Sequence, residues 1–409
     1  MTIEQSSTRL RTPGLGRRSL TGVLLQRILP RLMGRLACGQ LVIETPGRDY
    51  LVFRGMHPGP SAQLSIHHPR FLQRLLTSGD VGFAQSYMAG EWSTPDLHAL
   101  LTVLSATSQD NPTGRTPRLR IARRLRHALN RNTRSGSRRN IAAHYDLGNA
   151  FYGFWLDAGM NYSSALFNAA PQTLDQAQEA KLDRVTELLA LRGGEHVLEI
   201  GCGWGSLAQR LAQRHSCRVL GLTLSTEQLA FACQQLAGET AQGCEFRLQD
   251  YRDVIGQFDR IVSIEMLEAV GEAYWPAFFA QVRECLRPDG IAVLQVISID
   301  EARFASYRRR PDFIQRHIFP GGMLPTPRII EREAARAGLR LVQSEFFGSS
   351  YARTLQEWQR RFQAAWPNIK TLGFDACFKR MWEYYLAYCQ VGFETGVLDV
   401  GFYKLVKSN

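Results

Sequence analysis

The sequence contains no run of about 18 or more apolar residues, the length that a membrane-spanning helix needs, so no such helix is expected. Its eight cysteines show neither regular pairing nor CxxC spacing, which argues against a disulfide framework and against a zinc site. We therefore expect reduced cysteines, a cytosolic compartment and no bound metal. Hydrophobic residues, in contrast, are not scarce. Of the 409 residues 44% are hydrophobic and 21% are charged, which excludes a largely disordered chain.

Acidic residues are missing from one segment of the chain. Residues 111–139 contain ten arginines and no acidic residue, and the whole chain carries a formal charge of +12. Such a segment attracts an anionic partner. An anionic bilayer and a nucleic acid would both be attracted by this charge, so the charge alone does not choose between them.

The length of the chain and its shifts in composition predict two domains. We expect an N-terminal α+β domain over residues 1–110, an arginine-rich linker over 111–139 and a second domain over 140–409. The first domain should begin with an amphipathic helix near residues 20–36, bent at Pro30.

Local patterns predict three further elements in the N-terminal domain. Leu41–Ile43 and Tyr50–Phe53 have the composition of strands and flank a turn-like Pro-Gly pair. A helix is predicted from Phe71 to Leu76, ended by Ser78 and Gly79. None of these segments indicates a chemical function.

The second domain alternates strands with helices. Helical patterns cover 207–213, 227–236 and 275–286, and they lie between apolar runs with strand character. This alternation predicts an α/β fold with a doubly wound, mainly parallel sheet of seven strands. The expected strands are 196–201, 218–224, 244–250, 258–266, 290–299, 339–347 and 401–407.

A glycine-rich turn follows the first of these strands. Gly201, Gly203 and Gly205 precede a helix, and such glycines let the backbone approach a ligand closely. The third glycine comes one residue too early for a dinucleotide fingerprint, and no acid ends the second strand. The Lys-Ser/Thr pair of a P-loop is also missing. The turn therefore favours a nucleoside without a pyrophosphate, and S-adenosylmethionine is the candidate.

Residues 140–409 resemble the cyclopropane-fatty-acyl-phospholipid synthase family, which includes the mycolic acid cyclopropane synthases. The resemblance rests on HYDLGN at 144–149, MNYSS at 160–164, GCGWG at 201–205, LQDYRD at 248–253, FPGGMLP at 319–325 and AAWP at 364–367. The N-terminal third resembles the accessory domain of the members that act on phospholipids. The resemblance therefore implies a membrane phospholipid as substrate.

The resemblance also implies a reaction. Such enzymes bring the methyl group of S-adenosylmethionine to the cis double bond of an acyl chain, and a bound bicarbonate removes a proton from the resulting cation as a cyclopropane ring closes. The implied partner is an anionic membrane with unsaturated phospholipids, contacted peripherally from the cytoplasmic side. Nucleic acid is not an expected partner, and a homodimer is left open. The aromatic-rich segment 354–393 is expected to form a helical cover over the acyl site.

Five catalytic-site residues follow from the resemblance. Glu268 matches the acid that holds bicarbonate, Tyr351 matches a tyrosine that bonds the same anion, and Cys389 matches a cysteine near the active site. Ser164 stands where the family often has cysteine, and Gln295 stands where it often has histidine. Because glutamine cannot titrate, the anion shell is altered. A methyl-branched product, formed without ring closure, is therefore the alternative to a cyclopropane.

The resemblance assigns the cofactor contacts from one end of the ligand to the other. The methionine end would meet Tyr162 and Ser163, and the backbone of the glycine turn would approach it. The ribose would meet Thr223, Leu224 and Gln228, and the adenine would lie between Asp250 and Tyr251. Residue Asp250 has an alternative interpretation as a turn residue that caps the strand.

Two other functions remain as alternatives. A nucleic-acid methyltransferase should carry an Asn/Asp-Pro-Pro-aromatic motif or a catalytic Pro-Cys pair, and the sequence has neither. A non-catalytic lipid-binding protein on a degenerate methyltransferase fold is the second alternative. The intact glycine turn and Glu268 argue against it.

Overall fold

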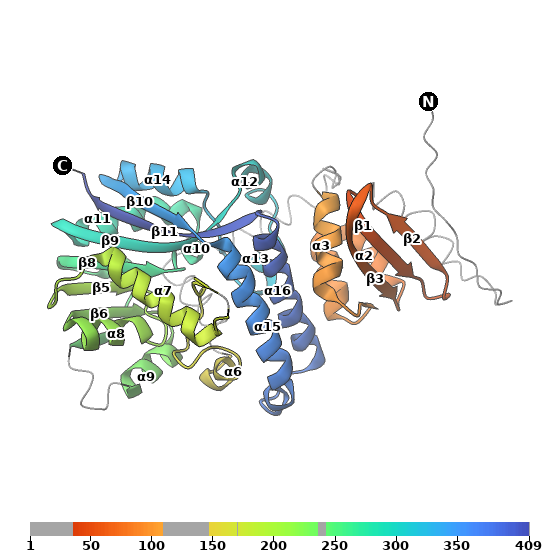
Figure 1. Ribbon diagram of the computed structural model, residues 1–409, viewed down its shortest axis with the longest axis horizontal. Helices are drawn as coiled ribbons and strands as arrows, with labels where there is room; N and C mark the ends of the chain where they lie inside the picture. Colours follow the sequence, from red (N-terminus) through yellow and green to blue (C-terminus); the bar gives the residue numbers. More distant parts are fainter. Residues whose placement is uncertain (1–35, 109–146, 170, 236–242, 409) are drawn as a thin grey trace. The chain divides into compact units, whose positions relative to one another are not determined.

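The computed structural model describes residues 36–108, 147–169, 171–235 and 243–408 (Figure 1). The predicted amphipathic helix and the arginine-rich linker fall almost entirely outside these residues, and so does the first half of the 144–149 motif. The chain forms two compact units. The first unit contains the described residues up to 108 together with Gly373–Val391, and the second contains the rest. Segment 373–391 thus groups with the N-terminal unit, whereas the predicted boundary placed it in the second domain.

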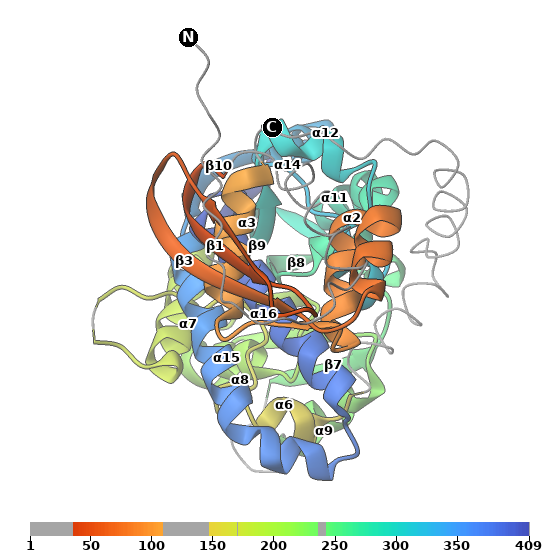
Figure 2. The same cartoon turned by 90° about the vertical axis from the view of Figure 1, so that its right-hand side faces the viewer.

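The first unit contains a four-stranded sheet in the order β2-β1-β3-β4. Strand β1 pairs antiparallel with β2 and parallel with β3, and β3 pairs antiparallel with β4. Helix α3 packs on β1 and β3, beside which it lies in Figure 2. The two predicted strands are confirmed. The element bounds are β1 (Cys38–Glu44), β2 (Tyr50–Arg54), β3 (His57–Ile66), α2 (Arg70–Met88), β4 (Trp92–Ser93) and α3 (Leu97–Ser108).

The predicted end of the first helix at Ser78-Gly79 is confirmed as a break, because Gly79 has a non-helical conformation, but a second helical segment that was not predicted follows it. Helix α2 continues to Met88, and Gly79 makes a kink within it at a φ of 57°. Glycine adopts this conformation without a side-chain clash, so the chain bends there and resumes the helix. The second half of the helix then buries Val81 and Phe83 in the core of the unit.

The second unit is built on a seven-stranded sheet in the order β10-β11-β9-β8-β5-β6-β7. Five neighbouring strands from β9 to β7 are parallel, and β11 runs antiparallel to both β9 and β10. All seven predicted strands and the doubly wound, mainly parallel class are confirmed. The strands are β5 (His196–Ile200), β6 (Arg218–Thr223), β7 (Cys244–Leu248), β8 (Phe258–Ile264), β9 (Leu286–Ile299), β10 (Leu339–Phe346) and β11 (Leu398–Lys407).

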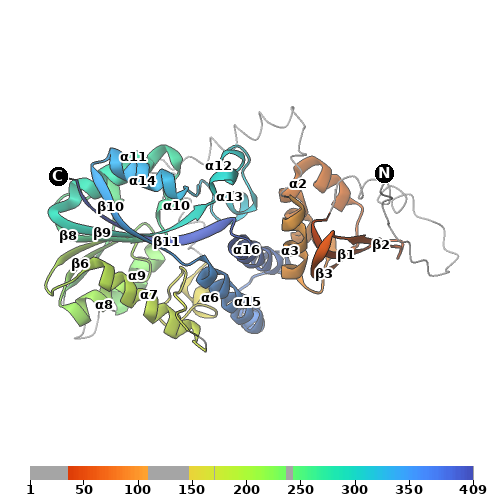
Figure 3. The same ribbon diagram turned by 45° about the horizontal axis from the view of Figure 1, so that its top comes forward.

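Helices cover both faces of this sheet (Figure 3). One face carries α7 (Leu174–Leu189), α8 (Ser206–His215) and α9 (Thr226–Gln235), and the other carries α10 (Leu267–Val270), α11 (Trp275–Cys285) and α14 (Pro327–Arg336). Central strand residues such as Leu198 and Ile261 are fully buried between these layers. The remaining helical elements are α6 (Asn149–Gly153), η2 (Tyr251–Asp253), η3 (Glu272–Tyr274), α12 (Glu301–Tyr307), α13 (Phe313–His317), α15 (Gly348–Thr371) and α16 (Ala376–Glu394).

The segment predicted as a helical cover is helical, as α15 and α16. Most of α16 belongs to the first unit, where Arg380 donates a hydrogen bond to the carbonyl of Met88 at 2.9 Å. Its role as a cover stays a prediction. In the described ranges we find no helix that is both long enough and apolar enough to cross a membrane.

Packing within α2 generates a stability prediction. A Cβ atom added at Gly82 would lie 2.0 Å from the backbone oxygen of Arg74, which cannot move away as a flexible side chain would. We expect Gly82→Ala to destabilise the first unit by about 1–3 kcal/mol, the usual range for overpacking. Gly47→Ala is the matched control, because its nearest neighbour would lie 3.7 Å away. Calorimetry should show a lower melting temperature for Gly82→Ala alone.

Candidate active site

The glycine turn joins β5 to α8 at the carboxyl end of the sheet. Gly201, Gly203 and Gly205 all have positive φ, at 85°, 53° and 90°. A Cβ atom at Gly201 would lie 2.9 Å from Met266, and one at Gly205 would lie 2.7 Å from Phe246. A Cβ at Gly203 would meet no described atom within 4 Å. The turn therefore has open space at Gly203, at the edge where α/β sheets bind ligands.

The end of β6 lies beside this turn. The amides of Gly201 and Cys202 donate to the carbonyl of Leu222 at 3.0 and 2.8 Å. One residue further, the Thr223 hydroxyl donates to Oε1 of Gln228 at 2.8 Å, and both side chains are buried. The structure thus brings Thr223 and Gln228 together next to the glycine turn, with the half-buried Leu224 between them. Their contact with a ribose stays a prediction.

Asp250 is engaged with its own turn. Its carboxylate forms a two-point ion pair with Arg252, at 2.8 Å from Nε and 2.6 Å from Nη2, and it caps η2 through the Arg252 amide. Asp250 is thus the N-cap residue of η2, shortly after the end of β7. Tyr251 is buried against Phe278, and burial raises the pKa of its hydroxyl to about 12. The adenine contacts of Asp250 and Tyr251 stay predictions.

Three of the predicted anion-binding residues converge on one carboxylate. The Ser164 amide donates to Oε1 of Glu265 at 2.8 Å, Gln295 Nε2 donates to the same oxygen at 2.7 Å, and the Tyr351 hydroxyl donates to Oε2 at 2.7 Å. The predicted shell of donors exists, but its centre is Glu265. That these residues also surround an anion held by Glu268 stays a prediction.

The backbone of Glu265 is unusual as well. Glu265 directly follows β8 and has a φ of 48°, a left-handed conformation that is uncommon for residues other than glycine. Its amide donates to the carbonyl of Gln295 at 2.8 Å, which fixes the loop against β9. Strained residues held in this way concentrate at functional sites.

Glu268 lies one turn further, on α10, with its carboxylate in a different environment. Its Oε1 accepts a hydrogen bond from the Ile297 amide, while its buried Oε2 has no partner among the described residues. Burial, and then the charge of Glu265, raise the pKa of Glu268 to about 8. Two buried carboxylates this close do not both ionise readily. Since Glu265 has three donors, we assign the negative charge to Glu265 and the proton to Glu268 at neutral pH.

A buried cation that no sequence motif indicated lies beside this site. Lys181 on α7 is only 1% exposed, and its Nζ donates to the Ser163 hydroxyl at 3.0 Å. Burial lowers the pKa of Lys181 to about 8, while the charges of Asp157, Glu265 and Glu199 act in the opposite direction. One signal for it was present, since Lys181 lies on the helix face that also carries the buried residues Leu174 and Ala177. For Glu265, the signal was an acid at the carboxyl end of a predicted strand.

Aromatic rings surround Tyr162. Its ring centroid lies 5.4 Å from that of Tyr152, 5.5 Å from Trp155 and 5.3 Å from Trp358. Tyr351, which holds Glu265, packs edge-on against Trp358 at 6.1 Å. The π faces of such rings attract cations. Tyr162, Ser163, Ser164, Gln295 and Tyr351 are thus brought together. Cys389 lies on α16 within the first unit, and its role in the site stays a prediction.

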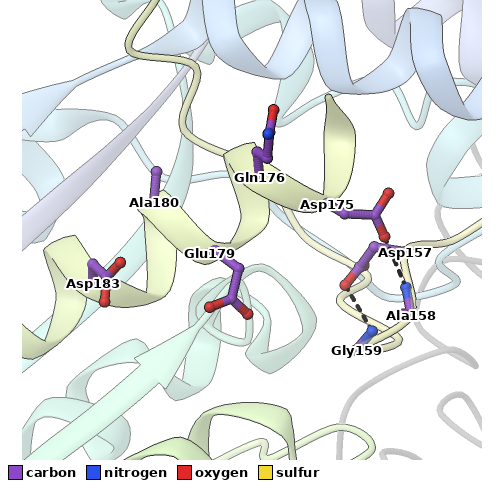
Figure 4. Close-up of a pocket in the computed structure, with 8 residues that line it drawn as sticks. All are labelled: Asp157, Ala158, Gly159, Asp175, Gln176, Glu179, Ala180 and Asp183. Carbon is purple, nitrogen blue, oxygen red and sulfur yellow. Dashed lines mark hydrogen bonds between the residues drawn. The ribbon is translucent and has the colours of Figure 1, made fainter. Parts of the chain in front are cut away.

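A cavity of about 390 Å³ lies along the side of α7 that carries Asp175, Glu179 and Asp183. It is lined by Asp157, Ala158, Gly159, Asp175, Gln176, Glu179, Ala180 and Asp183 (Figure 4). These acids have structural partners, since Arg210 binds Glu179 and Asp183 and Arg361 binds Asp175. The cavity is therefore not a candidate for the active site. Over the described ranges, no group of three or more His, Cys, Asp or Glu residues could hold a metal ion.

Comparison with known proteins gives a consistent result. The family described as mycolic acid cyclopropane synthetase matches residues 132–402. Tuberculostearic acid methyltransferase UfaA1 of Mycobacterium tuberculosis is 41% identical over 84% of this chain and 83% of its own length. Cyclopropane-fatty-acyl-phospholipid synthase of Escherichia coli is 36% identical over 89% of this chain and 92% of its own length.

Solved structures show the same similarity over about two thirds of the chain. The cyclopropane synthase MmaA2 from Mycobacterium tuberculosis is 31% identical, with a TM-score of 0.62 over 66% of this chain and 98% of its own. The mycolic acid cyclopropane synthase CmaA1, solved as a complex with SAH and CTAB, is 30% identical with the same TM-score of 0.62 over the same shares of the two chains.

The open space at Gly203 generates a binding prediction. Because a Cβ at Gly203 would project into the space that a nucleoside cofactor needs, we expect Gly203→Ala to weaken S-adenosylmethionine binding by at least about tenfold, equivalent to about 1.4 kcal/mol. Gly194→Ala is the control, since it also has positive φ and open space but lies before β5. Titration calorimetry measures both variants. Unchanged affinity in a folded Gly203→Ala protein would contradict the placement of the cofactor.

Proposed function

The chain belongs to the family of mycolic acid cyclopropane synthetases and is an S-adenosylmethionine-dependent methyltransferase, and we propose that its acceptor is the cis double bond of an unsaturated acyl chain in a membrane phospholipid. Two observations support this acceptor. The described site is lined by aromatic side chains, and the 36% identity to the phospholipid-acting synthase of Escherichia coli extends over 89% of this chain, including its N-terminal unit. Peripheral association with the membrane is part of the proposal.

One observation carries the mechanism, namely the three hydrogen bonds to Glu265. The donors expected for bicarbonate are Ser164, Gln295 and Tyr351, and all three are used by this carboxylate. The residues present therefore do not fit a bound bicarbonate at this place. We propose that the Glu265 carboxylate is the base of the reaction.

The glycine turn and the ends of β5 and β6 fit S-adenosylmethionine, which supplies an electrophilic methyl group when bound. The π electrons of the alkene form the new carbon–carbon bond, and the methyl–sulfur bond breaks with its electron pair on sulfur. A cation remains on the second alkene carbon. The ring faces of Tyr162 and Trp358 stabilise it, by about 2 kcal/mol or more when water is excluded. Glu265 then accepts a proton, and the electrons of the broken C–H bond neutralise the cation.

The position of that proton decides the product. Loss from the new methyl group closes a cyclopropane, whereas loss from a neighbouring chain carbon leaves a methyl-branched alkene. We propose the non-cyclised product. The carboxylate of Glu265 is fixed to the loop after β8, whereas a free anion could move within the site. The 41% identical relative is named a methyltransferase, which agrees with this choice. A cyclopropane is the second candidate, favoured by the name of the Escherichia coli relative.

Substitution of Glu265 tests the base. Since general bases contribute about 10²–10⁴-fold to rates, we expect Glu265→Gln to lower turnover by at least about 100-fold while S-adenosylmethionine affinity is kept. Glu268→Gln is the matched control, because an amide resembles a protonated carboxyl group, and it should stay near parental activity. Parental turnover should also persist in carbonate-depleted buffer. A bicarbonate requirement, or an active Glu265→Gln protein, would contradict the assignment.

Product analysis uses unsaturated phospholipid vesicles. The cyclised and non-cyclised products are isomers of equal mass, so mass spectrometry shows only that one carbon was added. Proton NMR of the extracted lipids separates ring methylene protons from vinyl protons. Vinyl signals are expected, and ring signals alone would establish the cyclopropane synthase instead.

A further inference from the structure

We propose that Lys181 is a positioning residue that keeps Glu265 ionised, by supplying the positive charge of the buried site. The inference rests on the proposed role of Glu265 as the base, and it adds a residue that sequence motifs did not indicate. Lys181 does not touch the acceptor in this scheme. It acts through the Ser163–Ser164 segment and through its charge.

The burial of Lys181 requires an explanation. It is 1% exposed on a helix face that packs on the sheet, whereas lysines are almost never fully buried unless they are paired. Within the described part of the chain its Nζ forms no ion pair, and its hydrogen bond goes to the neutral hydroxyl of Ser163 at 3.0 Å. The positive charge is therefore balanced only at longer range.

Helix α7 connects this charge to Glu265. Gln178, one turn before Lys181, donates to the carbonyl of Ser163 at 2.9 Å, and Lys181 donates to the hydroxyl of the same residue. The next residue, Ser164, donates its amide to Glu265 at 2.8 Å. Two side chains of α7 thus fix the segment that holds the base.

Several titratable groups face this pair. Toward Lys181 these are Asp157, Glu265 and Glu199, and toward Glu265 they are Lys181, Glu268 and the hydroxyl of Tyr351.

After Asp157, Glu265 is the carboxylate that interacts most strongly with the charge of Lys181. Burial raises the pKa of Glu199 and of Glu268 to about 8. Burial raises the pKa of Glu265 as well, but its three hydrogen bonds and the charge of Lys181 act in the opposite direction. Asp157 already accepts bonds from the Gly159 and Asn161 amides and from the Asn161 side chain. Lys181 therefore stabilises the charge of Glu265 in addition to that of Asp157.

This arrangement fixes the direction of the pH dependence. Glu265 must lose its proton to act, so activity falls as the pH drops through the pKa of Glu265. Lys181 must keep its proton, and since its pKa lies at about 8, activity falls again above that pH. A bell-shaped profile of turnover is expected.

Two substitutions separate the charge of Lys181 from its hydrogen bond. Lys181→Gln keeps a donor for Ser163 but removes the charge, so the acidic limb of the turnover profile should move up by about one pH unit or more. Lys181→Arg keeps the charge at every accessible pH, so the acidic limb should stay and the alkaline limb near pH 8 should disappear. Melting temperature and S-adenosylmethionine affinity establish that each variant is folded. Equal profiles for the two variants, or a parental profile for Lys181→Gln, would overturn the proposal.

An infrared measurement is independent of activity. At neutral pH, Lys181→Gln should show an additional stretch of a protonated carboxyl group that is missing from the Lys181→Gln, Glu265→Gln double variant. If Lys181→Gln does not fold, an alkaline limb retained by Lys181→Arg still overturns the proposal. An active Glu265→Gln protein with the infrared band present would refute the base and leave the role of Lys181 standing. An inactive Glu265→Gln protein without the band would refute only Lys181.

Discussion

A buried carboxylate is the constraint on which the second unit depends. Removing such a group from water costs several kcal/mol unless hydrogen bonds and opposite charge compensate. The three donors to Glu265 come from three separate places: the loop before α7, strand β9 and helix α15. These elements must all be in position before the carboxylate is satisfied. The hydrogen bonds of one side chain therefore tie the sheet to the helices around it.

The ionisable side chains around Glu265 differ in their hydrogen bonding. Glu268 and Glu199 each leave a buried oxygen without a partner among the described residues, and burial raises the pKa of both. Lys181 provides the positive charge, and Asp157 is held by amide groups. A single cation and a set of acids with different hydrogen bonding thus give neighbouring carboxyl groups different protonation states. Such separation is typical of acid–base sites.

The sequence predicted the elements well, because strand and helix patterns depend on local periodicity. The seven strands of the second unit and the glycine turn followed from such patterns. The break at Gly79 was predicted as well, but the helical segment that follows it, up to Met88, was not. The contacts of Glu265 could not be predicted in the same way. Which carboxylate meets Ser164, Gln295 and Tyr351 depends on contacts over 30 to 101 positions, and no local pattern records them.

The position of β11 has a consequence for the order of events during synthesis. This strand emerges after α15 but inserts between β9 and β10, where Phe402 pairs with Gln295. Until it emerges from the ribosome, β9 has an open edge beside the residue that holds Glu265, and β10 has no neighbour in the sheet. We therefore expect the hydrogen bonds to Glu265 to be complete only after β11 has been synthesised, even though every donor to Glu265 precedes it in the chain.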